Sequence, residues 1–274
     1  MLLEHLCARL GVELVVDVVA TGLVHRYSGA RFAIRDLIGG GAIGVLRLVR
    51  HRYGVNMYAD PRFSKPARGD RGWLTDPEQA SGGLLPSASI HAISTIGWML
   101  GDPVFESIRA SVREIHPNAI AGIEDHVNMS IHTSNDCEIE FEDSWAVDQP
   151  FETSFHGDRG WLKISGPNYN DLALQGECHG TVPEEFSAYI GNHRIQANPH
   201  TFDRPGISGF QGLAIDVIRA CRDGGSDTLP DILHALNMRN VIDAAVRSSN
   251  SGSEQPIAWT PPLRAALPKE SLQP

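Results

Sequence analysis

Residues 82–101 limit most strongly how this chain can fold. The stretch opens on Gly82 and Gly83 and ends at Gly101-Asp102-Pro103, which are turn residues that typically bound a helix. At about 100° per residue, the helix has two opposite faces, and neither carries a charged side chain. One face holds Leu85, Ala88, Ala92, Ile96 and Met99, and the other holds Ser87, His91, Ser94 and Trp98. A surface helix would present Lys or Glu, so we expect both faces to be covered.

His91 leaves two interpretations open. In the first, it is a buried histidine whose ring is held by a serine or a backbone carbonyl, as buried polar groups usually are. In the second, the face that carries Ser87, His91, Ser94 and Trp98 turns to a cleft, where it meets a substrate that needs an imidazole and hydroxyl groups. The helical spacing alone does not choose between a structural and a catalytic histidine.

Short strands separated by turns follow this helix. Apolar and polar residues alternate through residues 124–133 and 137–146, and Ser134-Asn135-Asp136 between them has the composition of a hairpin turn. Further strands are expected at residues 45–53, 104–115, 151–156, 160–164 and 171–174. Helices are expected at residues 30–38, from Phe210 and after Asp231, whereas residues 177–205 resemble a loop. The pattern predicts an antiparallel or mixed sheet with one polar face.

The first twenty residues have a different character. Residues 2–10 fit a short amphipathic helix, and residues 12–20 form a valine-rich strand that is apolar on both sides. Strands of this kind belong inside parallel sheets that are covered on both faces. We therefore expect strand 12–20 to have been built for a sheet that the rest of this chain does not supply.

Gly39 to Gly44 match the pattern G-x-G-x-x-G. A dinucleotide-binding turn must follow a strand and open a helix, so that the pyrophosphate meets the helix N-terminus. This turn instead follows a predicted helix and precedes a predicted strand. We interpret it as a helix-to-strand turn that needs glycine at positive φ.

Composition excludes several classes of protein. The formal net charge of −10 argues against nucleic-acid binding, and four widely spaced cysteines without C-x-x-C indicate neither a disulfide scaffold nor a zinc ribbon. His126 and His132 lie on one side of the same predicted strand but too far apart to share an ion, so no metal site is expected. No apolar run is long enough to span a membrane, and Met1 to His5 lack the positive start of a secretory signal. We expect a cytoplasmic protein without nucleic-acid or membrane partners.

Three segments around residues 82–101 carry a family resemblance. Trp73-Leu74-Thr75-Asp76-Pro77 leads to the glycine pair, Ile90-His91-Ala92-Ile93 follows, and Trp98-Met99-Leu100-Gly101-Asp102-Pro103 ends the helix. Their order and spacing resemble the GFO/IDH/MocA family of glucose–fructose oxidoreductases and inositol dehydrogenases. The resemblance extends over residues 12–260 and concerns the C-terminal domain of that family, with the N-terminal nucleotide-binding domain largely absent.

The resemblance implies an α/β (α+β) fold, in which an open, mixed and mostly antiparallel sheet carries helices on one face. A helix–strand remnant of a Rossmann domain would precede it. Residues 1–26 would be this remnant, residues 27–260 the substrate and dimerisation domain, and residues 261–274 a flexible tail rich in proline. The open face of the sheet is expected to pair with a second copy of the chain.

Family members use NAD or NADP to move hydride to or from a secondary alcohol of a sugar or cyclitol. The resemblance places His91 on the family's catalytic histidine, next to the reacting oxygen. Substrate contacts are expected from Arg26, Tyr27, Arg71, Trp73, Ser87 and Ser94. The family's E-K-P motif does not occur in this sequence, and no cofactor contact is expected within this chain. NAD or NADP is therefore not expected to bind the chain alone, and a separate nucleotide-binding subunit is a possible partner.

The helix departs from the family at three positions. Ser87 and Ser94 stand where the family has Asp, and Ser89 stands where it has Gly. A carboxylate one turn before His91 would orient the imidazole and raise its basicity, whereas a serine supplies no charge. Two hypotheses follow: an oxidoreductase polypeptide whose nucleotide-binding half is missing from this chain, or a non-catalytic sugar-binding or dimerisation module.

Overall fold

The computed structural model describes residues 21–59, 76, 80, 82–203, 209–223 and 228–260. The expected helix and strand of residues 1–20, the tail of residues 261–274, and both Arg71 and Trp73 lie outside the described residues.

The described residues contain a ten-stranded sheet in the order β10-β2-β3-β4-β1-β5-β6-β7-β9-β8. Its strands are β1 (Leu46–Gly54), β2 (Phe105–Arg113), β3 (His126–Thr133), β4 (Glu138–Ser144), β5 (Gln149–Gly157), β6 (Gly160–Gly166), β7 (Ala173–Cys178), β8 (Ile190–Gly191), β9 (Arg194–Ala197) and β10 (Gln255–Pro256). The central β1–β4 pair is parallel and the other neighbours are antiparallel. The prediction of an open, mixed and mostly antiparallel sheet is confirmed.

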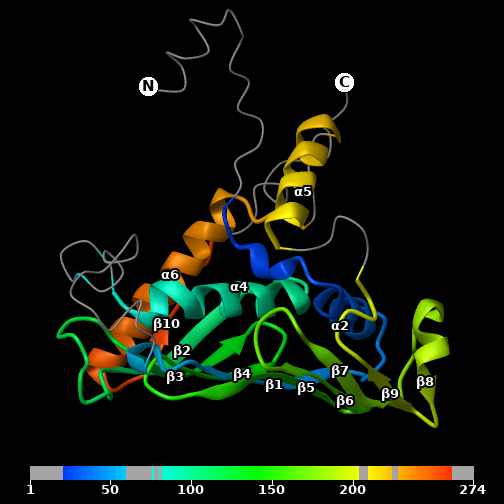
Figure 1. The fold of residues 1–274 in the computed structure, drawn as a ribbon, viewed down its shortest axis with the longest axis horizontal. Coiled ribbons are helices and arrows are strands. Elements are labelled where there is room, and N and C mark those ends of the chain that lie inside the picture. The colour runs from blue at the N-terminus through cyan, green and yellow to red at the C-terminus, as the bar shows by residue number, and fades with distance from the viewer. Residues whose placement is uncertain are drawn as a thin grey trace, which may run out of the picture.

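The described helices gather on one face of this sheet, and none of them covers its opposite face, which we call the bare face (Figure 1). They are η1 (Val24–Arg26), α2 (Gly29–Gly39), η2 (Met57–Ala59), η4 (Leu85–Ser89), α4 (Ile90–Met99), η5 (Glu184–Tyr189), α5 (Gly209–Asp223) and α6 (Ile232–Ser251). Helix α4 runs across the middle of the covered face, between α2 and α6. No helix among the described residues is long and apolar enough to cross a membrane.

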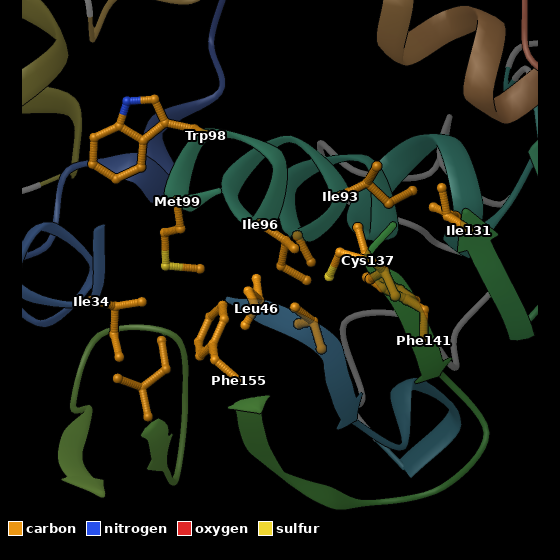
Figure 2. Packing of buried hydrophobic residues seen from close by; sticks show 14 of the residues in the cluster. Ile34, Leu46, Ile93, Ile96, Trp98, Met99, Ile131, Cys137, Phe141 and Phe155 are labelled. Carbon is orange, nitrogen blue, oxygen red and sulfur yellow. The ribbon is translucent and has the colours of Figure 1, made fainter. Parts of the chain in front are cut away.

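The apolar face of α4 is buried against the sheet as predicted. Ile96 and Met99 point toward Leu46 of β1 and Phe155 of β5, and these residues belong to one buried cluster (Figure 2). Trp98 points to the opposite side of the helix. Burial of these large apolar side chains is the main force that fixes α4 on the sheet.

The prediction that Trp98 faces a cleft together with His91 is wrong. Trp98 has an exposed fraction of 0%. Its indole lies edge-on to Phe32 of α2, with ring centroids 4.9 Å apart, and the Arg35 guanidinium sits 4.6 Å from its centroid. The neighbouring helix α2 therefore covers the second face of α4 at this end.

Two segments are more ordered than their composition indicates. Residues 177–205, expected as a loop, contain η5, β8 and β9. Just before the expected tail, Trp259 packs on Phe105 at 5.1 Å between ring centroids, and the Thr260 amide donates to Asn237 Oδ1 at 2.8 Å. The preceding strand β10 adds to the edge of β2 through backbone pairing, which side-chain composition does not reveal.

The glycine turn of residues 39–44 joins α2 to β1, which confirms the helix-to-strand interpretation. Gly41 and Gly44 have φ values of +85° and +73°, a region that favours glycine. The carbonyls of Ala42 and Ile43 accept hydrogen bonds from the backbone amides of Gly180 and Arg159, both at 2.9 Å. The turn is packed against other backbone.

Arg26 of η1 ties α4 to the start of α6. Its guanidinium donates to Ser94 Oγ at 3.2 Å and to the carbonyl of Thr228 at 3.3 Å, and it contacts the His234 ring. Ser94 Oγ also lies 2.8 Å from His234 Nε2. The Arg26 side chain is 2% exposed, and burial lowers its pKa to about 10, so it remains a buried cation. Burial and the charge of Arg26 together lower the pKa of His234 to about 3.

Substituting Gly44 by Ala should destabilise the fold by about 1–3 kcal/mol, because an L-residue is strained at positive φ. A Cβ there would also lie 2.0 Å from Asp158 Oδ1. Gly39→Ala is the matched control: a Cβ at Gly39 meets nothing within 4 Å, so stability should be unchanged or increase by up to about 1 kcal/mol. Urea unfolding of both variants measures the difference, and equal stabilities would contradict this account of the turn.

Acid should destabilise the protein through His234. Its pKa is lowered from 6.5 to about 3 in the folded chain, so the unfolded chain binds an extra proton between these values. The stabilisation from a neutral His234 is present above pH 6.5 and is lost as the pH falls toward 3, with a slope of up to about 1.4 kcal/mol per pH unit. His234→Gln keeps an acceptor for Arg26 but does not titrate, so its stability should fall less steeply with acid in urea unfolding. An unchanged slope would show that folding does not lower the pKa of His234.

Candidate active site

The helix that carries His91 begins as a wider π-helical turn, η4, before α4 continues as a regular helix. Glu124 holds this start: its carboxylate accepts from the backbone amides of Gly83 at 2.6 Å and Leu85 at 3.0 Å. Gly83 allows the close approach, since a Cβ there would lie 2.1 Å from the Glu124 carbonyl oxygen. A carboxylate on free amides at a helix N-terminus is favourable for both hydrogen bonding and charge. π turns of this kind are frequent at functional sites.

His91 lies in the first turn of α4 and is half-buried. Its Nδ1 is buried and has no hydrogen-bond partner among the described protein atoms. Burial lowers the pKa of His91, which favours a neutral imidazole at pH 7. Its backbone carbonyl accepts from Thr95 Oγ1 at 2.7 Å. The ring therefore has a fixed backbone and, within the described part of the chain, no carboxylate partner.

Two further rings lie behind His91. The His25 ring is 4.7 Å from the His91 ring, between centroids, and stacks on Tyr169 at 4.5 Å. The Arg31 guanidinium donates to the carbonyls of His25 at 2.7 Å and Tyr169 at 3.0 Å. Burial, with the nearby charge of Arg31, lowers the pKa of His25 to about 3. The ring of His91 thus contacts the neutral ring of His25, which lies beside the buried Arg31 cation.

A buried polar chain joins the same helix to the middle of the sheet. Ser89 Oγ donates to Asp143 Oδ2 of β4 at 2.7 Å, and Asp143 Oδ1 lies 3.3 Å from His51 Nε2 of β1. His51 Nδ1 lies 2.7 Å from Thr153 Oγ1 of β5. All four side chains are buried, with exposed fractions of 3% or less. The chain fixes the start of α4, two residues before His91, on three adjacent strands.

The predicted substrate contacts are placed in different surroundings. Ser87 is half-buried in η4, on the turn before His91. Arg26 and Ser94 are brought together, but they bond to each other and to His234. The Tyr27 hydroxyl donates to Asp216 Oδ2 of α5 at 2.9 Å. Through these internal bonds Arg26, Tyr27 and Ser94 join the surrounding helices.

Several residues at this site were missed by sequence reasoning. Asp143 had a detectable signal, because it follows Ile139 and Phe141 on the buried phase of β4, where a charge is unexpected. His51 likewise follows Val49 on the buried phase of β1. His25 lies in the three-residue helix η1 and Tyr169 in an irregular segment, and neither is long enough or regular enough for periodicity to identify a buried face.

The glycine turn does not fit a dinucleotide. Its backbone amides already donate within the protein, Gly40 to Asp36, Gly41 to Ile38 and Ala42 to Leu37, and a Cβ at Gly40 would lie 2.5 Å from Pro183. The turn follows a helix, so it opens no helix N-terminus toward a pyrophosphate. Among the described residues, no three His, Cys, Asp or Glu side chains lie together in a way that could hold a metal ion.

The fold resembles those of known oxidoreductases. An aldose–aldose oxidoreductase from Caulobacter crescentus, complexed with glycerol, superposes with a TM-score of 0.69 at 17% identity, covering 93% of this chain and 67% of that one. A levoglucosan dehydrogenase in complex with NADH gives a TM-score of 0.68 at 18% identity, covering 89% and 67%. GenD2 from gentamicin A biosynthesis, in complex with NAD, superposes with a TM-score of 0.64 at 20% identity, covering 93% of this chain and 67% of that one. This chain spans about two thirds of each of these proteins.

Sequence comparison places part of the chain in a family. No protein of curated function matches it. The family model of the GFO/IDH/MocA C-terminal domain matches residues 32–163, which include α2, the helix bearing His91 and strands β1 to β5. The resemblance to the GFO/IDH/MocA family is therefore confirmed over residues 32–163, which match its C-terminal domain.

Proposed function

We propose that this chain supplies the substrate-binding and catalytic part of an NAD(P)-dependent oxidoreductase that acts on a secondary alcohol of a sugar or cyclitol. The observation that carries the proposal is His91, which is half-buried at the start of a fixed helix with its pKa lowered by burial. A neutral imidazole accepts the proton of a substrate hydroxyl and returns it in the reverse direction. His91 is thus the proposed acid–base residue.

The glycerol, levoglucosan and nicotinamide nucleotides named for the structural neighbours support a polyol substrate and an NAD(P) cofactor. The described residues do not fit the cofactor at the glycine turn, and we derive no step through it. We propose that NAD or NADP is held by a nucleotide-binding part outside these residues, in another segment or in a separate subunit.

On the substrate side, Ser87 is the predicted contact that the geometry leaves best placed, since it lies in the turn before His91. Arg71 and Trp73 remain proposed substrate contacts. Arg26, Tyr27 and Ser94 act indirectly in this proposal, by holding η1, α4, α5 and α6 around the site.

A second copy of the chain is the proposed partner of the bare sheet face. This face carries paired charges of both signs, such as Arg50 and Glu140 at 2.6 Å and Lys163 and Glu152 at 3.3 Å. A surface that displays both signs can be complementary to itself across a two-fold axis. The pairing would leave the helix-covered face and His91 open to substrate.

A non-catalytic sugar-binding or dimerisation module is the second candidate function. Ser87 and Ser94 favour it, because both positions lack the carboxylates that would orient and charge the histidine. The two functions predict different outcomes when His91 is removed.

His91→Ala should lower turnover by about 10²–10⁴-fold in the oxidoreductase assembled with its nucleotide-binding part, because a general acid–base group is lost. Steady-state NAD(P)H absorbance measures the loss. Added imidazole should restore part of the rate in this variant if the histidine is catalytic. Wild-type turnover in His91→Ala would leave His91 a structural residue and favour the non-catalytic module.

Ser87→Asp should place a carboxylate one turn before His91 and raise the pKa of the imidazole. The acid limb of the pH profile of kcat/KM should then move to higher pH, while turnover above this limb stays unchanged or increases. Ser87→Asn is the uncharged control and should leave the limb in place. A shift of equal size in both variants would show that charge is not the cause.

The chain alone should show no saturable binding of NADH or NADPH by isothermal titration calorimetry. The reason is that the backbone amides of its glycine turn already donate hydrogen bonds within the protein. Micromolar binding would contradict the proposal that the nucleotide is held elsewhere.

A further inference from the structure

A small cavity lies between α4 and the sheet, behind the stacked rings of His25 and Tyr169. Its walls combine apolar side chains (Ala92, Ile96, Met99 and Phe151) with polar ones (His25, Arg31, His51, Thr95, Thr153 and Tyr169). About 10 Å³ of it is open to the centre of a water molecule. This is about the space that one bound water needs.

Three of the lining side chains carry a buried polar atom without a hydrogen-bond partner among the described protein atoms: His25 Nδ1, His51 Nε2 and Tyr169 Oη. Such atoms are rare in folded proteins, because each forfeits the hydrogen bond that water offered it in the unfolded chain. That three of them belong to the wall of one cavity indicates a shared partner.

The His51–Asp143 contact shows the same deficit. His51 Nε2 and Asp143 Oδ1 are 3.3 Å apart, yet neither makes a well-aligned hydrogen bond. Asp143 and burial also raise the pKa of Tyr169 well above its usual value, so the phenol keeps its proton and remains a donor. The cavity is thus lined by one hydrogen-bond donor, the Tyr169 hydroxyl, and by the imidazole rings of His25 and His51.

We propose that one water molecule is bound in this cavity and joins Tyr169, His25 and His51 into a single hydrogen-bond chain that ends at Asp143. Empty cavities in proteins have apolar walls, whereas buried waters occupy polar sites with two to four partners. The His25–Tyr169–His51 site has both the room and the partners.

The bound water makes Tyr169 and His51 positioning residues for His25. His25 has no other partner for Nδ1, and its ring supports the ring of His91 at 4.7 Å. The water site is independent of any activity of the chain, whereas its effect on His91 rests on the proposed function.

A crystal structure of the wild-type chain at high resolution tests the water directly. We expect density for one ordered water within about 2.7–3.2 Å of Tyr169 Oη and of His25 Nδ1. A cavity without density, or one closed by movement of the rings, would overturn the proposal.

The direction in which Tyr169→Phe changes the Tm also tests the proposal. The substitution removes only the hydroxyl and keeps the ring that stacks on His25. If the hydroxyl bonds to water, its loss should lower the Tm by about 2–4 °C. If the cavity is dry, removal of an unpartnered polar group should leave the Tm unchanged or raise it, which would contradict the proposal.

Tyr53→Phe is the matched control. Its ring contacts Tyr169, with centroids 4.5 Å apart, but it does not line the cavity. Its Tm should therefore stay close to that of the wild type. Both melting experiments and the crystal structure need no turnover, so a failure of the proposed activity leaves them interpretable.

Discussion

The buried carboxylate of Asp143 is the constraint on which the centre of this structure depends. A charge removed from water is tolerated only when neighbouring dipoles or charges replace its hydration. Here Ser89 of the π turn donates to Asp143 Oδ2, His51 Nε2 of β1 lies 3.3 Å from Oδ1, and Thr153 of β5 completes the row through His51 Nδ1. The surroundings of this one carboxylate therefore depend on the relative positions of the helix start and of three strands. The same contacts fix the position of His91, two residues after Ser89, above the sheet.

The surroundings of His91 differ in kind from those that the resemblance implies. The related family places a carboxylate one turn earlier, which would attract a proton to the ring. This chain instead has a serine there and sets a neutral imidazole, His25, beneath the ring, with the Arg31 cation alongside. Burial lowers the pKa of His91, and no carboxylate of the described residues counteracts this. A neutral imidazole is able to accept a proton, which is the property that the proposed function uses.

Hydrophobic periodicity predicted much of the fold. The helix at residues 85–99, strands β1 to β7 and the hairpin at residues 134–136 follow from local spacing and turn residues. Features that depend on distant backbone were not predictable. The parallel pairing of β1 with β4, the π turn, and the pairing of β10 with β2 each join segments far apart in sequence or alter a local hydrogen-bond pattern. Trp98 was misplaced for the same reason, because the cover on its face comes from α2.

The sequence by itself determined that His91 stands on an uncharged helix, because the spacing of residues along a helix is fixed by local geometry. It also excluded the glycine turn as a nucleotide site, since order along the chain decides which element follows a turn. Only the tertiary structure decided which polar side chains meet. Ser94 was expected to face a ligand and instead bonds to Arg26 and His234, while His25 and Tyr169 come to lie behind His91. These partners lie on segments brought together by core packing, and neither spacing nor composition encodes which buried groups will share a hydrogen bond.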